Sequence, residues 1–180
     1  ANTVQKFRSY DPTLEIIVVL PADHLDQWNE IKSEFLSDTR VVVAEGGSTR
    51  SESVKSGLSN IKGPGLVAVH DAVRPHVSKE VIAETFESAA KHGSGVAVVP
   101  LKDSIREISG EISAAKDRAN YVLVQTPQTF DVERLKNAYE KAGTQVFTDD
   151  ASVYESAGYQ VHLVEGDYAN IKITTPEDLR

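Results

Sequence analysis

The 180-residue sequence predicts an α/β fold in which a mostly parallel sheet is covered by helices on both faces and carries a protruding β-hairpin. Apolar runs of strand length alternate with amphipathic stretches of helix length, as in chains built from repeated strand–helix units. The apolar runs are nearly continuous valine and isoleucine, which indicates strands buried on both faces of a parallel sheet. The alternation breaks near residue 101, where short alternating segments surround a Ser-Gly turn and predict a hairpin.

The expected elements follow in chain order. The first residues, ANTVQKF, resemble the end of a helix, and the sequence then predicts strands at 14–21, 41–47, 66–71 and 95–100, with helices at 23–36, 48–61 and 78–93. Ser78 is placed to cap the helix at 78–93, and Gly93 is placed to end it. After the hairpin we expect helices at 131–142 and 149–157, a strand at 160–166, and a short last strand at 170–174.

These elements fit a single domain over residues 1–180 with a hairpin arm at about 101–122. A two-stranded arm is marginally stable by itself, so its apolar residues need another surface. A second subunit is a natural partner, and we therefore expect a homodimer formed through the arm.

The composition excludes several classes of protein. The chain carries a net charge of −8, so we do not expect it to bind nucleic-acid phosphates through a broad basic surface. It has no cysteine, which rules out disulfides and thiolate metal sites and fits a cytoplasmic location. No stretch approaches the roughly 18 consecutive apolar residues of a membrane helix, so no membrane partner is expected either.

In an open α/β sheet, ligands bind beyond the carboxyl ends of the strands. The polar residues that follow the predicted strands are therefore the candidate site, and they are Gly46, Gly47, Ser48, His70, Asp71, Ala72, Val73, Arg74, Lys102, Asp103, Ser104 and Lys172.

Two glycines stand between a strand and a helix in the segment EGGSTRSES, residues 45–53. Glycine allows the backbone to approach a ligand closely, and the N–H groups at a helix start suit an anion or a base edge. The alternative is a tight turn capped by Ser48. The segment is neither a dinucleotide fingerprint nor a P-loop.

Asp71 is the best single candidate for a metal ligand, because magnesium often takes one or two protein carboxylates together with substrate phosphates. Alternatively, Asp71 only pairs with Arg74, three residues further on. His70 is more readily explained as a hydrogen-bonded structural histidine than as a ligand, since a zinc site lacks other partners in this sequence.

Other charged residues have simple explanations on the sequence alone. Arg118 and Lys172 are isolated cations of a kind that usually lies on a solvated surface. Asp149 and Asp150 suit the positive end of a helix, with Thr148 as the expected cap.

Five segments in order nevertheless resemble one family: EGGSTRSESVKSGL, VHDAVRP, DRANYVLVQTPQTF, TDDAS and VEGDYANIKITTPEDL. They are similar to the 2-C-methyl-D-erythritol 4-phosphate cytidylyltransferases of the non-mevalonate isoprenoid route. The resemblance covers nearly the whole sequence and implies a Rossmann-like fold of the nucleotide-diphospho-sugar transferase type. It also implies an enzyme that transfers CMP from CTP to methylerythritol phosphate, with Mg²⁺ as cofactor and release of pyrophosphate.

The resemblance also assigns site residues. Gly46, Gly47, Ser48, Ser53, Asp71, Ala72 and Arg74 would form the CTP side, where Asp71 would hold the magnesium ion and Arg74 would fix its loop. The acceptor contacts would be Ser104, Arg118, Thr126, Thr148 and Lys172. Asp71, Arg118 and Lys172 would be the catalytic residues, and the hairpin arm would carry Ser104 and Arg118 into the pocket of a neighbouring subunit.

One departure from the family pattern concerns the N-terminal region. The family begins with a strand and a glycine-rich loop that wraps the triphosphate, and nothing in residues 1–40 matches this loop. We therefore expect that the sequence lacks a segment of the natural protein, including a strand that would be central to the sheet. Two alternatives to the leading function stay open: a ribitol-5-phosphate cytidylyltransferase, and a non-catalytic dimeric binding module without the phosphate loop.

Overall fold

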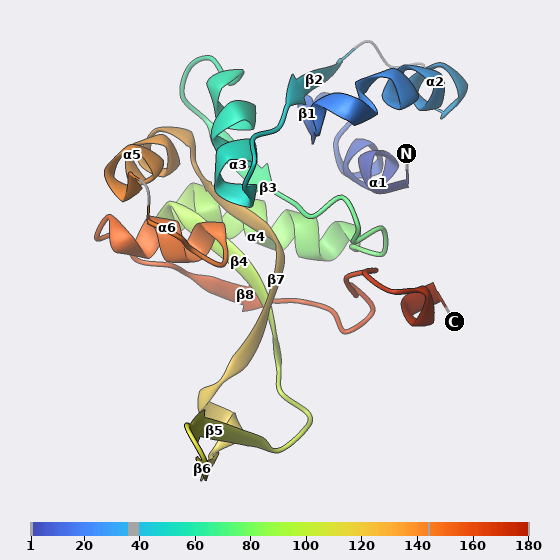
Figure 1. Ribbon diagram of the computed structural model, residues 1–180. Coiled ribbons are helices and arrows are strands. Elements are labelled where there is room, and N and C mark those ends of the chain that lie inside the picture. The colour runs from blue at the N-terminus through green and yellow to red at the C-terminus, as the bar shows by residue number, and fades with distance from the viewer. Residues whose placement is uncertain (1, 36–39, 144, 180) are drawn as a thin grey trace.

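The computed structural model describes residues 2–35, 40–143 and 145–179. The strands within these ranges form one larger and two smaller sheets. The larger sheet has the order β3 (Leu66–Val69), β7 (Val122–Asp131), β4 (Ser94–Pro100) and β8 (Leu163–Glu165). A parallel pair is formed by β1 (Ile16–Leu20) and β2 (Val41–Glu45), and an antiparallel hairpin by β5 (Ile105–Ser109) and β6 (Ile112–Lys116). Figure 1 shows this arrangement.

The larger sheet is mixed because β7 runs antiparallel to both of its neighbours, β3 and β4, whereas β4 and β8 are parallel. The α/β class is confirmed, but the sequence analysis did not identify β7 as a strand. Its sequence, VLVQTPQTFD, mixes apolar residues with amides, hydroxyls and a proline, so it lacks the continuous apolar pattern of the other strands. The predicted strand at 170–174 is wrong, since these residues have no strand structure.

Helices occupy the predicted positions. They are α1 (Asn2–Tyr10), α2 (Leu25–Phe35), α3 (Arg50–Ser59), α4 (Lys79–His92), α5 (Val132–Ala142) and α6 (Asp150–Ser156), with 3₁₀ turns η1 (Ala22–His24), η2 (Arg118–Asn120) and η3 (Pro176–Leu179). Ser78 accepts a hydrogen bond from the Val81 amide and so caps α4, as predicted. Gly93 ends that helix at a φ of 91°, a left-handed conformation that favours glycine.

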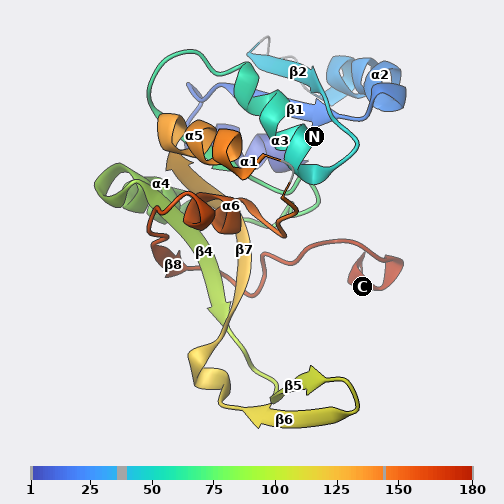
Figure 2. The same ribbon diagram turned by 60° about the vertical axis from the view of Figure 1, so that its left-hand side comes forward.

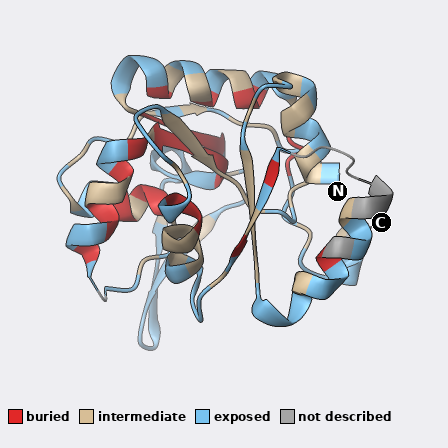
Figure 3. Ribbon diagram, turned by 90° about the horizontal axis from the view of Figure 1, so that it is seen from above, coloured by how far each residue is buried: buried red, intermediate tan, exposed pale blue. Residues whose placement is uncertain are grey.

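Helices cover both faces of the larger sheet, as predicted. Alternate residues of β4 point to opposite faces: Val96 and Val98 pack into a core with α5 and α6, whereas Ala97 packs into a second core with α4. Phe7 and Tyr10 of α1 contact this second core. Figure 3 shows the buried positions of the helices on the sides turned toward the rest of the molecule.

The β5–β6 hairpin confirms the predicted arm. Figures 1 and 2 show it extending away from the body of the molecule. Ile108 and Ile112 flank its turn and are 77% and 75% exposed. No helix within the described ranges is long and apolar enough to cross a membrane.

Candidate active site

Asp71 lies just beyond the carboxyl end of β3, at the position that the sequence analysis selected. The register of β3 against β7 places Val69 opposite Gln128. The backbone N–H of Asp71 then donates a hydrogen bond of 3.0 Å to the hydroxyl of Thr126 on β7. Thr126 is only 4% exposed, so a buried hydroxyl fixes the backbone of Asp71 against the neighbouring strand.

Two cations meet the carboxylate of Asp71, and we call these three side chains the Asp71 cluster. Lys172 Nζ lies 3.2 Å from Asp71 Oδ2, and Arg74 Nε lies 3.4 Å from the same oxygen. Arg74 Nη1 also donates to the backbone carbonyl of Asn170 at 2.7 Å. The alternative in which Asp71 pairs only with Arg74 is therefore wrong, because Lys172 is a second partner from a distant part of the chain.

The segment that carries Lys172 is held in place although it is not a strand. The Ile173 amide donates to the Val73 carbonyl at 2.9 Å, which attaches this segment to the loop after β3. Asn170 is fully buried, and its amide group donates to the Thr126 carbonyl at 2.8 Å. Lys172 thus reaches Asp71 from a fixed backbone, while its own side chain is 47% exposed and open to a substrate.

The charges of the cluster keep Asp71 ionised. Burial alone would raise the pKa of Asp71, but Lys172, supported by Arg50 and Arg74, lowers this pKa below its ordinary value. None of the hydrogen bonds between described residues reaches the second carboxylate oxygen, Oδ1. Asp71 therefore offers a negatively charged oxygen at neutral pH.

His70 has a structural role, as predicted. Its Nε2 lies 3.1 Å from the Arg74 carbonyl, which can only accept, so Nε2 carries the proton of the neutral ring. Burial lowers the pKa of His70 to about 4, and the ring stays neutral at physiological pH. The ring of Phe7 packs against it edge-on with centroids 5.0 Å apart. His70 thereby closes the loop that presents Asp71 and Arg74.

The glycine turn after β2 is closely packed. A Cβ at Gly46 would lie 2.9 Å from the Ser53 hydroxyl, and one at Gly47 would lie 2.2 Å from the Cβ of Glu52. The backbone therefore approaches the first turn of α3 more closely than any other residue type allows. Ser53, in that first turn, donates its hydroxyl proton to the Thr49 carbonyl at 3.0 Å.

The cap of α3 differs from the expectation. Thr49, not Ser48, is the N-cap: its hydroxyl accepts from the Glu52 amide at 3.1 Å, and the Glu52 carboxylate accepts from the Thr49 amide at 3.0 Å. This reciprocal pair is a capping box. Ser48 instead donates to the Glu52 carboxylate at 2.6 Å, so it belongs to the turn without capping the helix.

Thr148 lies at the N-terminus of α6 and is exposed. The predicted cap is again one residue off, since Asp149 accepts from the Ser152 amide at 3.0 Å and caps the helix. The Asp149 carboxylate satisfies this amide, and the Thr148 hydroxyl is left at the surface.

Ser104 and Arg118 lie on or next to the arm, and both are exposed. Arg118 donates to the carbonyl of Lys102 at the base of the arm. Among the contacts of described residues, none joins Ser104 or Arg118 to Asp71 or Lys172. Within one chain, the structure brings together Asp71, Ala72, Arg74, Thr126 and Lys172 and leaves Ser104 and Arg118 apart from them.

Sequence reasoning missed several residues that shape this site. Arg50, Gln128 and Asn170 were not selected, although all three contact its elements. Arg50 stood inside the glycine segment and was the one basic residue there, which was an available signal. Gln128 and Asn170 are buried amides in segments whose strand pattern is weak, and nothing in their spacing marked them.

Asp71 fits a magnesium ion as one ligand among several. No group of three or more histidine, cysteine, aspartate or glutamate side chains in the described parts of the chain could hold a metal by itself. Magnesium commonly uses one carboxylate and completes its shell with water and substrate phosphate oxygens. The ionised Asp71 with an unbonded oxygen meets that requirement.

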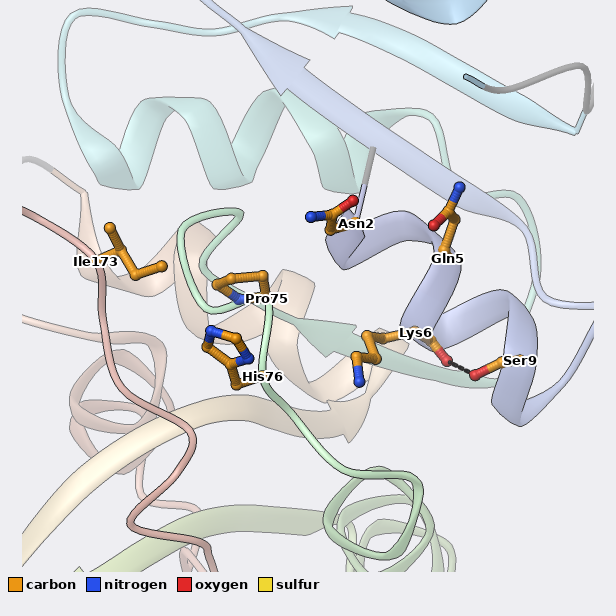
Figure 4. Close-up of a pocket in the computed structure, with 7 residues that line it drawn as sticks. All are labelled: Asn2, Gln5, Lys6, Ser9, Pro75, His76 and Ile173. Atoms are coloured by element: carbon orange, nitrogen blue, oxygen red, sulfur yellow. Dashed lines mark hydrogen bonds between the residues drawn. The ribbon is translucent and has the colours of Figure 1, made fainter. Parts of the chain in front are cut away.

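A cavity of about 540 Å³ lies beside the site, between α1 and the loop after β3 (Figure 4). It is lined by Asn2, Gln5, Lys6, Ser9, Pro75, His76 and Ile173. No predicted site residue lines this cavity, although Pro75 and Ile173 directly follow Arg74 and Lys172. The candidate active site around the Asp71 cluster therefore lies at the edge of the sheet and does not coincide with this cavity.

A glycine turn, a helix N-terminus and an ionised carboxylate flanked by cations lie at the rim of an α/β sheet, an arrangement that suits an enzyme acting on a phosphorylated ligand such as a nucleotide. Comparison with the sequences and structures of known proteins identifies the kind of enzyme. The profile of the family 2-C-methyl-D-erythritol 4-phosphate cytidylyltransferase (IspD) matches residues 1–180. The chain belongs to this family.

Individual relatives agree with the family assignment. The enzyme of this name from Bacteroides thetaiotaomicron is 48% identical over 179 residues, which cover 99% of this chain and 82% of the relative. The structure of 4-diphosphocytidyl-2C-methyl-D-erythritol synthase from Anaerococcus prevotii is similar with a TM-score of 0.89 and 30% identity, covering 99% of this chain and 81% of that chain. The cytidylyltransferase from Thermus thermophilus gives a TM-score of 0.81 and 34% identity, with coverages of 98% and 85%.

Proposed function

We propose that this protein transfers CMP from CTP to 2-C-methyl-D-erythritol 4-phosphate, giving 4-diphosphocytidyl-2-C-methyl-D-erythritol and pyrophosphate in isoprenoid precursor biosynthesis. The observation that carries the proposal is the Asp71 cluster, in which Lys172 Nζ lies 3.2 Å from an ionised carboxylate at the sheet rim. A reaction that joins two phosphorylated substrates needs such fixed charges, because the substrates repel one another.

The CTP side is formed by the glycine turn and the loop after β3. Gly46 and Gly47 let the cytidine approach the backbone, and Ser48 and Ser53 offer hydroxyls to the base or ribose. Ala72 and Arg74 border the phosphates beside Asp71. This arrangement uses backbone groups and hydroxyls rather than charges to read a neutral base edge.

The reaction itself requires alignment more than proton transfer. A phosphate oxygen of the acceptor attacks the α-phosphorus of CTP, a new P–O bond forms, and the bond to the β-phosphate bridging oxygen breaks with its electron pair leaving on pyrophosphate. The attacking oxygen is already ionised, so no proton has to be removed. Lys172 orients the acceptor phosphate, and the exposed Thr148 is the contact for its polyol part. Thr126, which the family resemblance also assigned to the acceptor, is buried and would act through the Asp71 backbone that it holds.

Magnesium is the expected cofactor, with Asp71 as its protein ligand. When bound, the ion neutralises charge on the CTP phosphates. Asp71 also fixes Lys172 and Arg74, so the same carboxylate organises both the ion and the cations around the substrates.

We further propose a cytoplasmic homodimer in which the arm completes the neighbouring active site. Two observations support this: Ile108 and Ile112 are largely exposed on the arm, and Arg118 lies away from the Asp71 cluster of its own chain. In a dimer the arm would bury its apolar residues and carry Ser104 and Arg118 to the acceptor of the partner subunit.

The acceptor is tested by measuring pyrophosphate release from CTP in the presence of magnesium. Release with methylerythritol phosphate is expected, with much slower release when ribitol 5-phosphate replaces it. Activity only with ribitol 5-phosphate would reassign the acceptor, and no nucleotide binding at all would favour a non-catalytic module.

A further inference from the structure

Asp150 is a carboxylate at the first position of α6 that is fully shielded from solvent. Arg50 Nη2 lies 2.6 Å from its Oδ2, and the Tyr139 hydroxyl donates to its Oδ1 at 2.5 Å. Removing a carboxylate from water costs several kcal/mol unless it is paired and hydrogen-bonded, and both conditions are met here. The sequence analysis had explained Asp150 only as a favourable charge at a helix start.

The pair joins two segments that are 100 residues apart in the chain. Arg50 is the first residue of α3 and directly follows the glycine turn, which the proposed function places against the nucleotide. Asp150 directly follows Thr148 and Asp149, at the corner that the proposed function places against the acceptor. One ion pair therefore connects the starts of two helices that serve different substrates.

The start of α6 is also attached to β7, the strand that fixes Asp71. Gln128 Nε2 donates to Asp149 Oδ2 at 3.0 Å, and Gln128 Oε1 accepts from the Ala151 amide at 2.9 Å. Gln128 lies two residues from Thr126, which accepts from the Asp71 amide. The start of α6, with Thr148 and Asp149, is thus connected in two directions, and we call it the acceptor corner. Through Gln128 and β7 it is connected to Asp71, and through Arg50 it is connected to the glycine turn.

We propose that Arg50 and Asp150 are positioning residues that fix the separation between the nucleotide turn and the acceptor corner. The inference rests on the proposed function for the identity of the two substrates. Asp150 is fully buried whereas the Arg50 side chain is 38% exposed, so the pair is only partly buried, and such pairs contribute little net stability. The effect of this pair is to hold the start of α3 against the start of α6, because Arg50 and Tyr139 each bind one oxygen of the Asp150 carboxylate and so fix its position.

The test compares Arg50→Met, Asp150→Asn and the double variant in initial-rate assays at a temperature where each protein is folded. We expect kcat/KM to fall about 10- to 100-fold for CTP and for the acceptor together, because the contact that holds the two subsites at a fixed distance is lost. The double variant should be no worse than the more damaged single variant, since the first change already breaks the pair. Arg50→Lys, which keeps the charge but not the planar fork, should lie between wild type and Arg50→Met.

The matched control is Asp131→Ala. Asp131 caps α5 by accepting from the Arg134 amide, so its loss destabilises the helix that carries Tyr139 without touching the ion pair. Equal losses of kcat/KM in Asp131→Ala and Asp150→Asn at equal loss of melting temperature would overturn the proposal. So would independent, additive effects of the two single variants.

A substrate-free measurement separates this inference from the proposed function. The Thr49 and Glu52 amides of the capping box report on the glycine turn. Their hydrogen exchange should become faster in Asp150→Asn and in Arg50→Met, and unchanged exchange in both would contradict the positioning role. A wild-type protein without transferase activity would refute the proposed function, while the exchange measurement would still decide whether the pair holds the turn.

Discussion

The neutral His70 ring makes a quantitative prediction about stability in mild acid. Burial lowers the pKa of His70 to about 4 in the folded protein, whereas the ordinary value in an unfolded chain is 6.5. Between these values the unfolded state binds more protons than the folded state, so the free energy of unfolding falls as the pH falls. The contribution of the neutral His70 ring to the free energy of unfolding is complete above its unfolded-state pKa of 6.5. It is lost progressively as the pH falls to about 4.

The magnitude follows from these two pKa values. Proton linkage removes about 0.2 kcal/mol of stability at about pH 7 and about 2 kcal/mol at about pH 5. His70→Gln can place its amide Nε2 near the position of the imidazole Nε2, so it keeps a side-chain donor for the Arg74 carbonyl, but it cannot be protonated in this range. Its unfolding free energy should therefore be about 2 kcal/mol less sensitive to this change of pH than that of the wild type.

Urea unfolding of both proteins at the two pH values measures this difference. Other groups with lowered pKa values, such as Asp71 and Glu52, are present in both proteins, so their effects cancel. An equal loss of stability in wild type and His70→Gln between the two pH values would refute the conclusion that the buried ring stays neutral.

Three further predictions concern the site and the arm. Asp71→Asn should raise the magnesium concentration needed for half-maximal rate and lower kcat/KM by about 10²–10³-fold, and an unaltered magnesium titration would contradict a role in binding the ion. Lys172→Ala should lower kcat by a similar factor while the protein remains folded; unchanged kinetics would remove Lys172 from the site. Replacing Ile108 and Ile112 by aspartate should convert a dimer into a monomer in sedimentation, whereas a persistent dimer would exclude the arm as its interface.

The sequence predicted the elements whose patterns are strong. The continuous apolar runs at 14–21, 66–71 and 95–100 are strands, and the Ser-Gly turn near residue 110 is the tip of a hairpin. The helices between them follow because amphipathic stretches of that length have few other ways to bury an apolar face. Asp71 was found by the same logic, since a carboxylate after a buried strand lies at the sheet rim.

The elements that escaped prediction are held by polar contacts. β7 places Gln128 and Thr129 in the interior, where their amide and hydroxyl groups are satisfied by partners distant in sequence. Lys172 reaches Asp71 from a segment without regular structure, through backbone bonds that no periodic pattern encodes. Thr49 rather than Ser48 caps α3, because either hydroxyl could do so and only the chain geometry selects one.

The central claim is that the rim around Asp71 and Lys172 is where the two phosphorylated substrates meet. A crystal structure of the protein with CTP and magnesium tests it most directly. The triphosphate is predicted to lie within reach of Asp71, with its α-phosphate turned toward the acceptor position at Lys172 and the base against the turn at Gly46 and Gly47. A nucleotide bound in the cavity between α1 and His76 instead, with the rim unoccupied, would contradict the account.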